Sequence, residues 1–335
     1  MDVSVIIPTH NGAAQLPAAL ASVIAQTTSR RLELVVVDDG STDTTPAVIE
    51  PYLKRYRNPT GKVYLHYLQQ EHRGVAAARN AALAHAAAPY VAFLDTDDYW
   101  DRFKLQRQFT AIREDPTIEM VHTAFRTIDQ QGDFTDTEPQ RLDNPCVGWC
   151  VEPMLRDHLV VLSSVLIRRE VLDQVPTVEP NGNVFDPHRT HCSDYDFLLR
   201  LAKVCRFVYV PEPLTLVGVG TDDDVAVKLP GRLGALCQMQ ADFVARYGQA
   251  LHLDAQRAHD DARQLLIRHA QALIDMGKHQ TAAQVCDVAQ QLDLYDQRFD
   301  ELRHRATKGR WLRRPITFLR AIGGTLSRLL TKRRD

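Results

Sequence analysis

Three aspartates crowd into four positions, Asp95, Asp97 and Asp98, directly after the apolar run at residues 90–94. Carboxylates at the end of a buried strand repel one another and lose hydration, so a fold retains them only where a cation or a proton offsets that cost. Sites made of carboxylates suit hard divalent cations such as Mg²⁺ or Mn²⁺, which commonly also bind a substrate diphosphate. The spacing therefore predicts a metal site. The alternative is that these residues cap a helix that begins near Trp100.

The order of strand, polar loop and helix recurs along the first hundred residues. Continuous β-branched and apolar strands that alternate with helices indicate a mostly parallel sheet with helices on both faces. Ligands bind beyond the carboxyl ends of such strands, where His10, Asp38, Asp39 and the Asp95 cluster lie. The predicted strands are residues 3–7, 32–37, 63–68 and 90–94, and helices are predicted from Leu16 to Ile24, over 44–56 and over 74–87.

Two common phosphate-binding motifs are missing from this sequence. No G-x-G-x-x-G follows the first predicted strand, and no G-x-x-x-x-G-K-[ST] occurs in the chain. A bound phosphate would then be held by the metal and by cationic side chains. The candidates for such a cationic side chain are Arg79 and, less directly, Arg73. The alternative for each is that it is a solvated arginine on the surface.

The first hundred residues contain five motifs that resemble those of the family 2 glycosyltransferases of the GT-A fold. The motifs occur in the same order as in that family. The matching segments are residues 3–12, 22–27, 33–43, 74–80 and 93–98. The resemblance implies a Rossmann-like sheet and a nucleotide-sugar donor, most simply a UDP-sugar. It also implies that Asp97 and Asp95 bind Mn²⁺ or Mg²⁺, and that the donor is contacted by Pro8, His10, Asp38, Asp39, Arg79, Asp95 and Thr96.

Sugar transfer needs a second acidic site, because the acceptor hydroxyl must lose its proton as it attacks. The segment 191–201 begins polar and becomes an apolar helix face, and it resembles the family's motif that carries the catalytic base. Asp194 stands in the place of that base, with Ser193 where the family usually has glutamate. The alternative is that Ser193 or Asp194 only caps the helix while Asp196 complements its dipole.

The sequence departs from the family again after a predicted strand (207–210), turn (211–213) and strand (214–217). Many relatives carry a histidine there that can bind the metal, and residues 216–224 contain none. Water, Asp97 and the diphosphate would then complete the metal's coordination, or the acidic run at 222–224 would supply a ligand.

Composition limits the class of protein. The 335 residues are 44% hydrophobic with a net charge of −2, and no run of eighteen apolar residues or signal peptide is present. We therefore expect a cytoplasmic protein. The six cysteines have no zinc-type spacing and are expected to be reduced core thiols.

The expected organisation is a catalytic domain at 1–225, a helical extension at 226–302 with a hairpin formed by 262–276 and 280–292, and a basic tail at 303–335. The tail alternates cations with bulky apolar residues, which suits peripheral binding to an anionic membrane, and a docked or solvated tail is the alternative. No motif for nucleic acid accompanies it.

These features predict a metal-dependent, inverting glycosyltransferase whose acceptor is a hydroxyl of a glycan or lipid-linked molecule. The alternative is a catalytically weak nucleotide-sugar-binding or scaffold protein that acts through its C-terminal helices.

Overall fold

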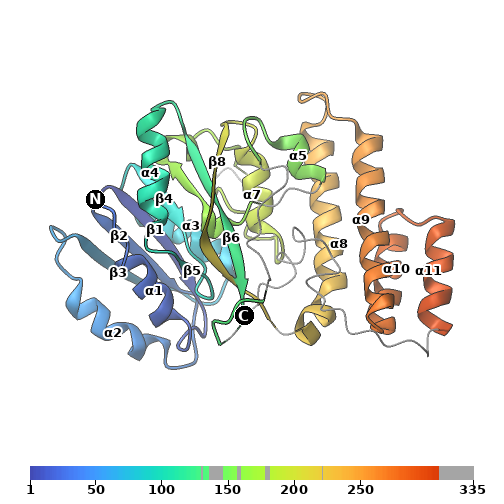
Figure 1. Ribbon diagram of the computed structural model, residues 1–335, viewed down its shortest axis with the longest axis horizontal. Coiled ribbons are helices and arrows are strands. Elements are labelled where there is room, and N and C mark those ends of the chain that lie inside the picture. Colours follow the sequence, from blue (N-terminus) through green and yellow to red (C-terminus); the bar gives the residue numbers. More distant parts are fainter. Residues whose placement is uncertain (130, 136–145, 157–159, 178–181, 221, 309–335) are drawn as a thin grey trace.

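The computed structural model describes residues 1–129, 131–135, 146–156, 160–177, 182–220 and 222–308, without the side chains of 222–226. An eight-stranded sheet with the order β3-β2-β1-β4-β7-β6-β8-β5 forms its centre (Figure 1). The strands are β1 (Val3–Thr9), β2 (Leu32–Asp38), β3 (Val63–Gln69), β4 (Tyr90–Phe93), β5 (Tyr99–Trp100), β6 (Met120–Ile128), β7 (Leu166–Arg168) and β8 (Phe207–Gly218).

The first four strands form one parallel block of this sheet, and β6 and β8 form a second parallel pair. β1 pairs in parallel with β2 and β4, and β2 pairs in parallel with β3. All residues of β1 and β2 are buried, as continuous apolar runs require. The register places Thr9 beside Asp38, so the carboxyl ends of these two strands meet at one edge. The predicted parallel arrangement is confirmed, although β7 and β5 join the sheet in antiparallel orientation.

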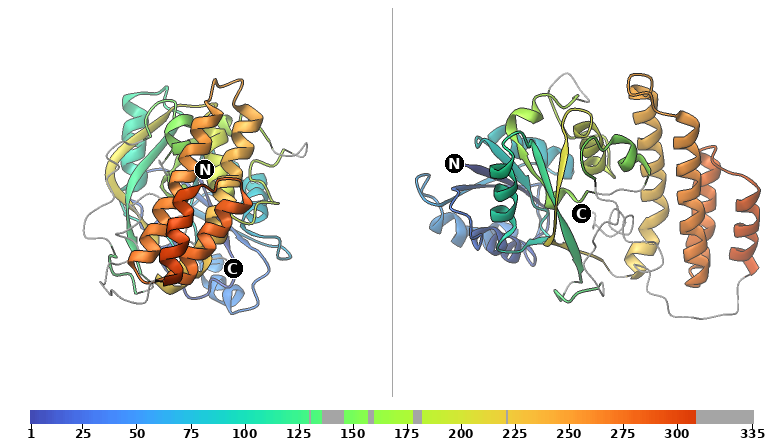
Figure 2. Two further views of the ribbon diagram at one scale, coloured as in Figure 1. Left: turned by 90° about the vertical axis from the view of Figure 1, so that its right-hand side faces the viewer. Right: turned by 45° about the horizontal axis from the view of Figure 1, so that its top comes forward.

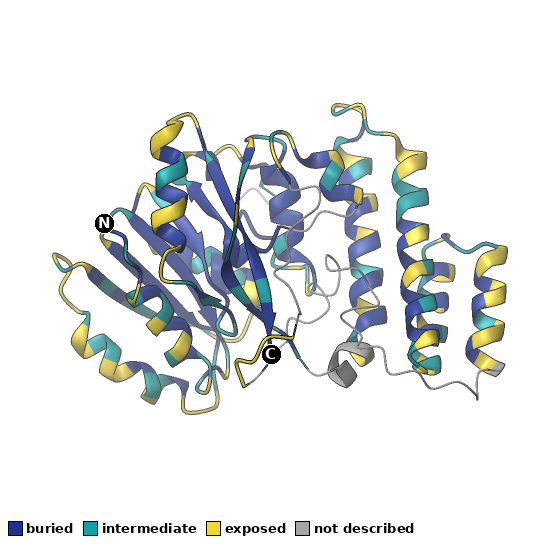
Figure 3. Cartoon of the chain, viewed as in Figure 1, coloured by how far each residue is buried: buried dark blue, intermediate teal, exposed yellow. Residues whose placement is uncertain are grey.

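Helices cover both faces of the sheet, as expected. One apolar cluster joins the sheet to α1, α2 and α4, and a second joins it to α3, α5 and α7. Figure 3 shows the strands buried between these layers. The helices are α1 (Leu16–Ile24), α2 (Thr45–Arg55), α3 (Val75–His85), α4 (Lys104–Glu114), α5 (Val151–Arg156), α6 (Arg169–Leu172) and α7 (Ser193–Leu201), with a 3₁₀ turn η1 (Leu162–Ser164).

Two local predictions were wrong. The segment after Asp98 does not begin a helix near Trp100, because β5 first pairs with residues 215–216 of β8 and α4 starts at Lys104. The predicted strand, turn and strand at 207–217 are one strand, since Pro213 pairs with Ala124 and shifts in register absorb the prolines.

Within the part of the chain that the structure describes, four helices follow the sheet: α8 (Asp222–Tyr247), α9 (Ala255–Asp275), α10 (His279–Gln291) and α11 (Gln297–Lys308). They stand side by side in Figures 1 and 2. The predicted hairpin is confirmed as α9 and α10, with Gly277 at a positive φ of 75° between them. Leu229 and Leu233 of α8 belong to the same apolar cluster as Phe197 of α7.

The expected domain boundaries fall inside helices of the structure. Position 225 lies within α8, and position 303 lies within α11. The greater part of the predicted tail, residues 309–335, lies outside the described residues. No helix of the described residues is long and apolar enough to cross a membrane. All six cysteines are buried, which confirms their expected place in the core, and none forms a disulfide in this structure.

Candidate active site

A cavity of about 510 Å³ lies where the carboxyl ends of β1, β2 and β4 meet the start of α7. The strand-end side of this cavity comprises the residues that follow these strands, together with the loop and helix at 72–79. The remaining part of the cavity lining is called the far wall, and it is formed by residues 187–194 and by Arg232 of α8. The predicted site residues that line the cavity are Pro8, His10, Arg73, Asp39, Arg79, Asp95, Thr96, Asp97, Ser193 and Asp194.

Asp38 is not among the described residues that line the cavity, although it was predicted to contact the donor. Its Oδ1 accepts a hydrogen bond from the Ser41 backbone N–H at 2.8 Å, and its Oδ2 accepts one from the Tyr67 hydroxyl at 2.5 Å. Burial, followed by the contact with Asp38, raises the pKa of Tyr67. In this structure Asp38 therefore fixes the turn after β2.

Asp39 organises the loop that leads into α3. Its Oδ1 accepts from Gln70 Nε2 at 2.6 Å and from the Arg73 backbone N–H at 2.9 Å, and its Oδ2 accepts from the Gly74 N–H at 2.7 Å. His72 Nδ1 lies 2.9 Å from the same Oδ2. Gly74, with φ of +88°, then starts the helix that carries Arg79. The carboxylate of Asp39 thus shapes one edge of the cavity.

Two histidine rings lie together on this side of the cavity. The centroids of His10 and His72 are 4.3 Å apart and their planes are tilted by 36°. The Nδ1 atoms of His10 and His72 lie 2.8 Å and 3.1 Å from the carbonyl oxygen of Asp39. His10 was predicted from the sequence, whereas His72 was not, because His72 lies in a loop without a regular pattern and is brought to the site by Asp39.

Arg79 is a buried cation at the centre of the acidic cluster. It is 3% exposed, and its Nη2 donates to Asp95 Oδ1 at 2.6 Å. Burial lowers its pKa, while the nearby charges of Asp194, Asp98 and Asp97 oppose that change. The alternative that Arg79 is a solvated arginine on the surface is therefore excluded. The Arg79 Nε atom has no hydrogen-bond partner among the described residues.

The aspartate cluster is held by two distant segments, at Ser163 and at Gly218. Asp98 is fully buried, with Oδ2 accepting from the Ser163 hydroxyl at 2.5 Å and Oδ1 accepting from the Gly218 N–H at 3.0 Å. Burial and the charge of Asp97 raise the pKa of Asp98 well above its usual value. The Asp95 N–H donates to Ser163 Oγ at 3.2 Å. Asp98 and Ser163 therefore support the two carboxylates that face the cavity.

Thr96 also has a defined place in this cluster. Its hydroxyl donates to the carbonyl oxygen of Pro8 at 2.6 Å, which ties the motif to the end of β1. A Cβ added to Gly12 would lie 2.2 Å from Thr9 Oγ1 and 3.0 Å from Thr96 Cγ2, so the turn after β1 packs directly against both.

Asp95 and Asp97 are the carboxylates of this cluster that line the cavity. The described residues contain no group of three or more His, Cys, Asp or Glu side chains placed to hold a metal ion. Two carboxylates offer only oxygen ligands, which suits Mg²⁺ or Mn²⁺ when a substrate supplies further oxygens. The oxygen atoms of Asp97 and Asp95 are therefore of the chemical kind that such an ion prefers.

Asp194 lies in the first turn of α7 and lines the cavity. The residue before this helix, Cys192, has the unusual φ of +60°, and no side chain caps the helix there. Asp194 Oδ1 accepts a local hydrogen bond from the Tyr195 N–H at 2.9 Å. Because Asp196 instead pairs with Arg200 at 2.6 Å, the two acids of this helix have different surroundings.

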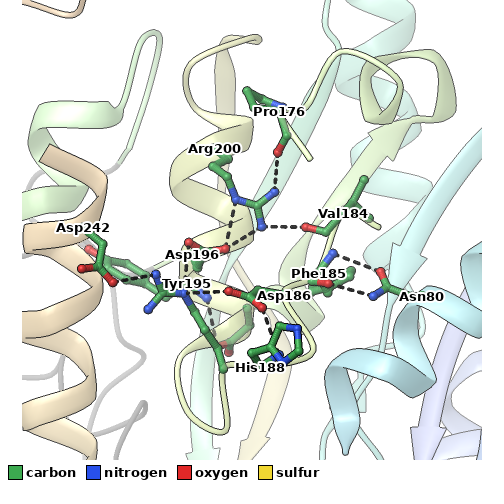
Figure 4. A network of polar contacts seen from close by, with 12 residues as sticks. Asn80, Pro176, Val184, Phe185, Asp186, His188, Tyr195, Asp196, Arg200 and Asp242 are labelled. Carbon is green, nitrogen blue, oxygen red and sulfur yellow. Dashed lines mark hydrogen bonds and ion pairs between the residues drawn. The ribbon is translucent and has the colours of Figure 1, made fainter. Parts of the chain in front are cut away.

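Buried polar contacts anchor the far wall (Figure 4). Arg200, 1% exposed, donates to the carbonyls of Pro176 at 2.7 Å and Val184 at 2.6 Å as well as to Asp196. Asn80, next to Arg79 on α3, donates to the Phe185 carbonyl at 2.8 Å and accepts from its N–H at 3.0 Å. These contacts join the wall to α3 and α7.

Known structures with this architecture are glycosyltransferases of the GT-A fold. TarS of S. aureus matches with a TM-score of 0.60 and 20% identity over 92% of this chain and 53% of its own. The mannosyltransferase PcManGT of Pyrobaculum calidifontis, solved with GDP-Man and Mn²⁺, matches with a TM-score of 0.56 and 21% identity over 96% of this chain and 85% of its own. At these identities the likeness shows the fold.

The family follows from the sequence itself. The model described as "Glycosyl transferase family 2" matches residues 4–173, which is half of the chain, and the chain belongs to this family. An uncharacterized glycosyltransferase of Nostoc sp. is 32% identical over 54% of this chain and 55% of its own. The putative teichuronic acid biosynthesis glycosyltransferase TuaG of Bacillus subtilis is 31% identical over 52% and 64%. The chain thus spans less than two thirds of either relative.

Proposed function

We propose that the protein transfers a sugar from a nucleotide diphosphate donor, a UDP-sugar in the first instance, to a hydroxyl of a glycan or lipid-linked acceptor, with inversion at the anomeric carbon. The observation that carries this proposal is that Asp95, Asp97 and Asp194, which come from two distant elements, line one cavity. That arrangement supplies a metal-binding pair and a proton acceptor around a shared volume.

The strand-end side would hold the donor's diphosphate. Asp97 and Asp95 would bind Mn²⁺ or Mg²⁺ together with phosphate oxygens, and the bound ion supplies Lewis-acid stabilisation of the departing diphosphate. Arg79 holds Asp95 by a 2.6 Å ion pair, and its buried charge adds to the positive potential at this place. The Arg79 Nε–H is a further donor for a bound ligand.

The nucleoside would lie toward β1 and β2. The paired rings of His10 and His72 offer a surface for a base, and Asp39 holds the loop on which His72 lies. TarS has been solved with UDP and with UDP-GlcNAc, and PcManGT with GDP-Man, which supports a nucleotide-sugar donor and leaves the base to be tested.

Asp194 would act as the general base. It would accept the proton of the acceptor hydroxyl while that oxygen attacks the anomeric carbon and the bond to the diphosphate breaks. Asp194 and Arg79 line the same cavity, so the proposed base shares this volume with the proposed donor site. A direct displacement of this kind inverts the anomeric configuration.

A panel of UDP- and GDP-sugars with Mn²⁺, compared with the same panel in EDTA, tests this function. We expect thermal stabilisation and slow, metal-dependent hydrolysis for the matching donor. Stabilisation without hydrolysis or transfer would favour a nucleotide-sugar-binding scaffold. Failure of every nucleotide-sugar to bind would contradict both functions.

We also propose that the basic segment at 309–335 brings the protein to an anionic membrane on the cytoplasmic side. The segment holds eight arginines and lysines and one acid, Asp335. Each cation near such a surface contributes on the order of 1 kcal/mol, and salt screens it. Deleting 309–335 should abolish salt-sensitive sedimentation with phosphatidylserine vesicles, and vesicle binding that survives the deletion would contradict this role.

A further inference from the structure

The two stacked histidine rings differ in which nitrogens remain for a ligand, and both nitrogens of His10 are bound to protein. The Oδ1 atom of Asn11 accepts from two backbone N–H groups in the loop after β2, at 2.9 Å and 3.2 Å, which fixes the orientation of its amide. The Nδ2 atom of Asn11 therefore donates to His10 Nε2, at 3.0 Å. Because Nε2 accepts, His10 carries its hydrogen on Nδ1 and donates it to the Asp39 carbonyl at 2.8 Å.

His72 keeps one ring nitrogen for a ligand. Its Nδ1 lies 2.9 Å from the Oδ2 atom and 3.1 Å from the carbonyl oxygen of Asp39, and both oxygens can only accept, so the hydrogen of the neutral ring is on Nδ1. Its Nε2 has no hydrogen-bond partner in the part of the chain that the structure describes. The side chain is half exposed and lines the cavity. In the neutral ring, Nε2 is therefore an acceptor available to a ligand.

The backbone around His72 is held in place from two directions. The N–H groups of Arg73 and Gly74 both donate to the carboxylate of Asp39. A Cβ added to Gly40, which has a φ of +76°, would lie 2.8 Å from His72 N and 3.2 Å from its Cβ, so the turn after β2 packs directly against residue 72. A side chain whose backbone is fixed in this way is preorganised for binding.

The carboxylate of Asp39 is itself already occupied. Its Oδ1 accepts from Gln70 Nε2 and the Arg73 N–H, and its Oδ2 accepts from the Gly74 N–H and lies beside His72 Nδ1. These four contacts match the roughly four acceptor sites of a carboxylate. A base that bonded directly to this carboxylate would have to displace one of them, so Asp39 contributes to recognition through His72.

On the basis of the proposed transferase function, we propose that His72 recognises the base of the donor nucleotide: its Nε2 accepts the ring N–H of the base, while His10 only stacks. Uracil at N3 and guanine at N1 carry this hydrogen beside a carbonyl group. Cytosine and adenine have a lone pair at the corresponding nitrogen, which would face the lone pair of Nε2. The donor class is then a sugar nucleotide of uracil, thymine or guanine, and Asp39 is the residue that positions His72.

The test compares UDP with CDP, which differ only at the base edge, by calorimetry on the full chain with Mn²⁺ at pH 8, where an ordinary histidine is neutral. GDP and ADP form a second pair. We expect UDP to bind more tightly than CDP. His72→Phe keeps a ring and removes the acceptor, so affinity for UDP should fall about two- to ten-fold, as for the loss of one neutral hydrogen bond. Affinity for CDP should not fall, and the preference should disappear.

Three further variants separate recognition from stacking. His10→Phe keeps a ring and should keep the preference for UDP over CDP, whatever it does to the affinity for both. His85→Phe replaces an exposed histidine of α3 that is not among the described lining residues, and it should change nothing. His72→Gln offers an amide oxygen as acceptor and should retain part of the preference, which provides a second variant if His72→Phe does not fold.

The ring ¹⁵N chemical shifts of His72 provide a readout that a merely structural role would not move. In the UDP complex at pH 8 we expect hydrogen on Nδ1 and none on Nε2. Hydrogen on Nε2, or a preference for UDP that survives in His72→Phe, would overturn the proposal. Loss of the preference in His10→Phe alone would assign recognition to the other ring.

The same titrations separate the two proposals. If the unmodified protein binds no nucleoside diphosphate, the transferase function itself fails. If it binds UDP and CDP equally, and GDP and ADP equally, only the assignment of His72 fails.

Discussion

The two sides of the cavity are built in different ways. The strand-end side consists of short motifs that hold one another by hydrogen bonds, as when Asp39 fixes the loop before α3 and Thr96 binds the carbonyl of Pro8. The far wall has little regular structure before α7, and it depends on buried ionic contacts such as those of Arg200.

The difference suggests a division of tasks. Parallel strands give the strand-end side a fixed frame, which suits the proposed diphosphate and metal. The far wall is attached to this frame through a few residues, of which Asn80 is a direct link from α3. Because the far wall is attached in this manner, its ligand can change while the strand-end side stays the same. Four substitutions test whether the two sides are separable.

Asp194→Asn should have the largest effect. The amide keeps the shape of the side chain and cannot take the acceptor proton, so transfer should fall by about two to four orders of magnitude. Affinity for the donor, measured by calorimetry with UDP and Mn²⁺, should be nearly unchanged. Transfer that survives within a few-fold would show that Asp194 only begins the helix.

Arg200→Met should damage the far wall and leave the strand-end side in place. The variant removes the 2.6 Å partner of the buried carboxylate of Asp196 and leaves it with the longer contact to Arg189 at 3.5 Å, and breaking a buried ion pair of this kind costs about 3–5 kcal/mol. Urea unfolding measures the loss, and the double variant Asp196→Asn with Arg200→Met should recover part of it. Arg113→Met, an exposed arginine of α4, is the matched control. A cost below about 1 kcal/mol would contradict the anchoring role.

Asp97→Ala acts on the strand-end side alone. It removes a proposed metal ligand, so the Mn²⁺-dependent affinity for UDP should fall. Loss of a side chain that only supports a metal ligand lowers metal affinity roughly 10- to 100-fold, and the fall expected here is larger. Circular dichroism should show an intact fold, since this residue is only partly buried. Unchanged affinity would remove Asp97 from the metal site.

Asn80→Ala should have the smallest effect, and it tests the link between the two sides. Loss of both bonds to Phe185 should cost about 1–3 kcal/mol of stability, measured by urea unfolding. Sugar transfer should decline more than the affinity for UDP, because the loop that Asn80 holds at Phe185 belongs to the far wall. Asn80→Asp keeps the acceptor and loses the donor, so its stability should be intermediate. A loss of UDP affinity as large as the loss of transfer would show that the two sides are not separable.

The strand-end side could be predicted well from the sequence because its signals are local. Motifs at the ends of β1, β2 and β4 and at the start of α3 meet in the cavity because parallel strands end at one edge. The adjacent residues Asp38 and Asp39 could not be distinguished, since only the folded turn shows that Tyr67 engages the first.

The far wall was predicted only in part. Asp194 could be found because it lies in a recognisable polar start of an apolar helix. Ser163 and Arg232 escaped because neither has a local signal, and each reaches the site through contacts between segments far apart in the chain. The helix expected near Trp100 failed for the same reason, since its strand partner lies in β8.

The position of α8 has a practical consequence for anyone who trims or recombines this chain. Leu229 and Leu233 pack into the apolar cluster that contains α7, and Arg232 between them reaches the cavity. A fragment that stops before this helix would expose that cluster and open the cavity to water. A fragment that keeps the cavity closed must therefore include α8. Because α9 and α10 belong to the same apolar cluster, a chimera that divides the chain within the loop at 248–254 must also preserve their packing against α8.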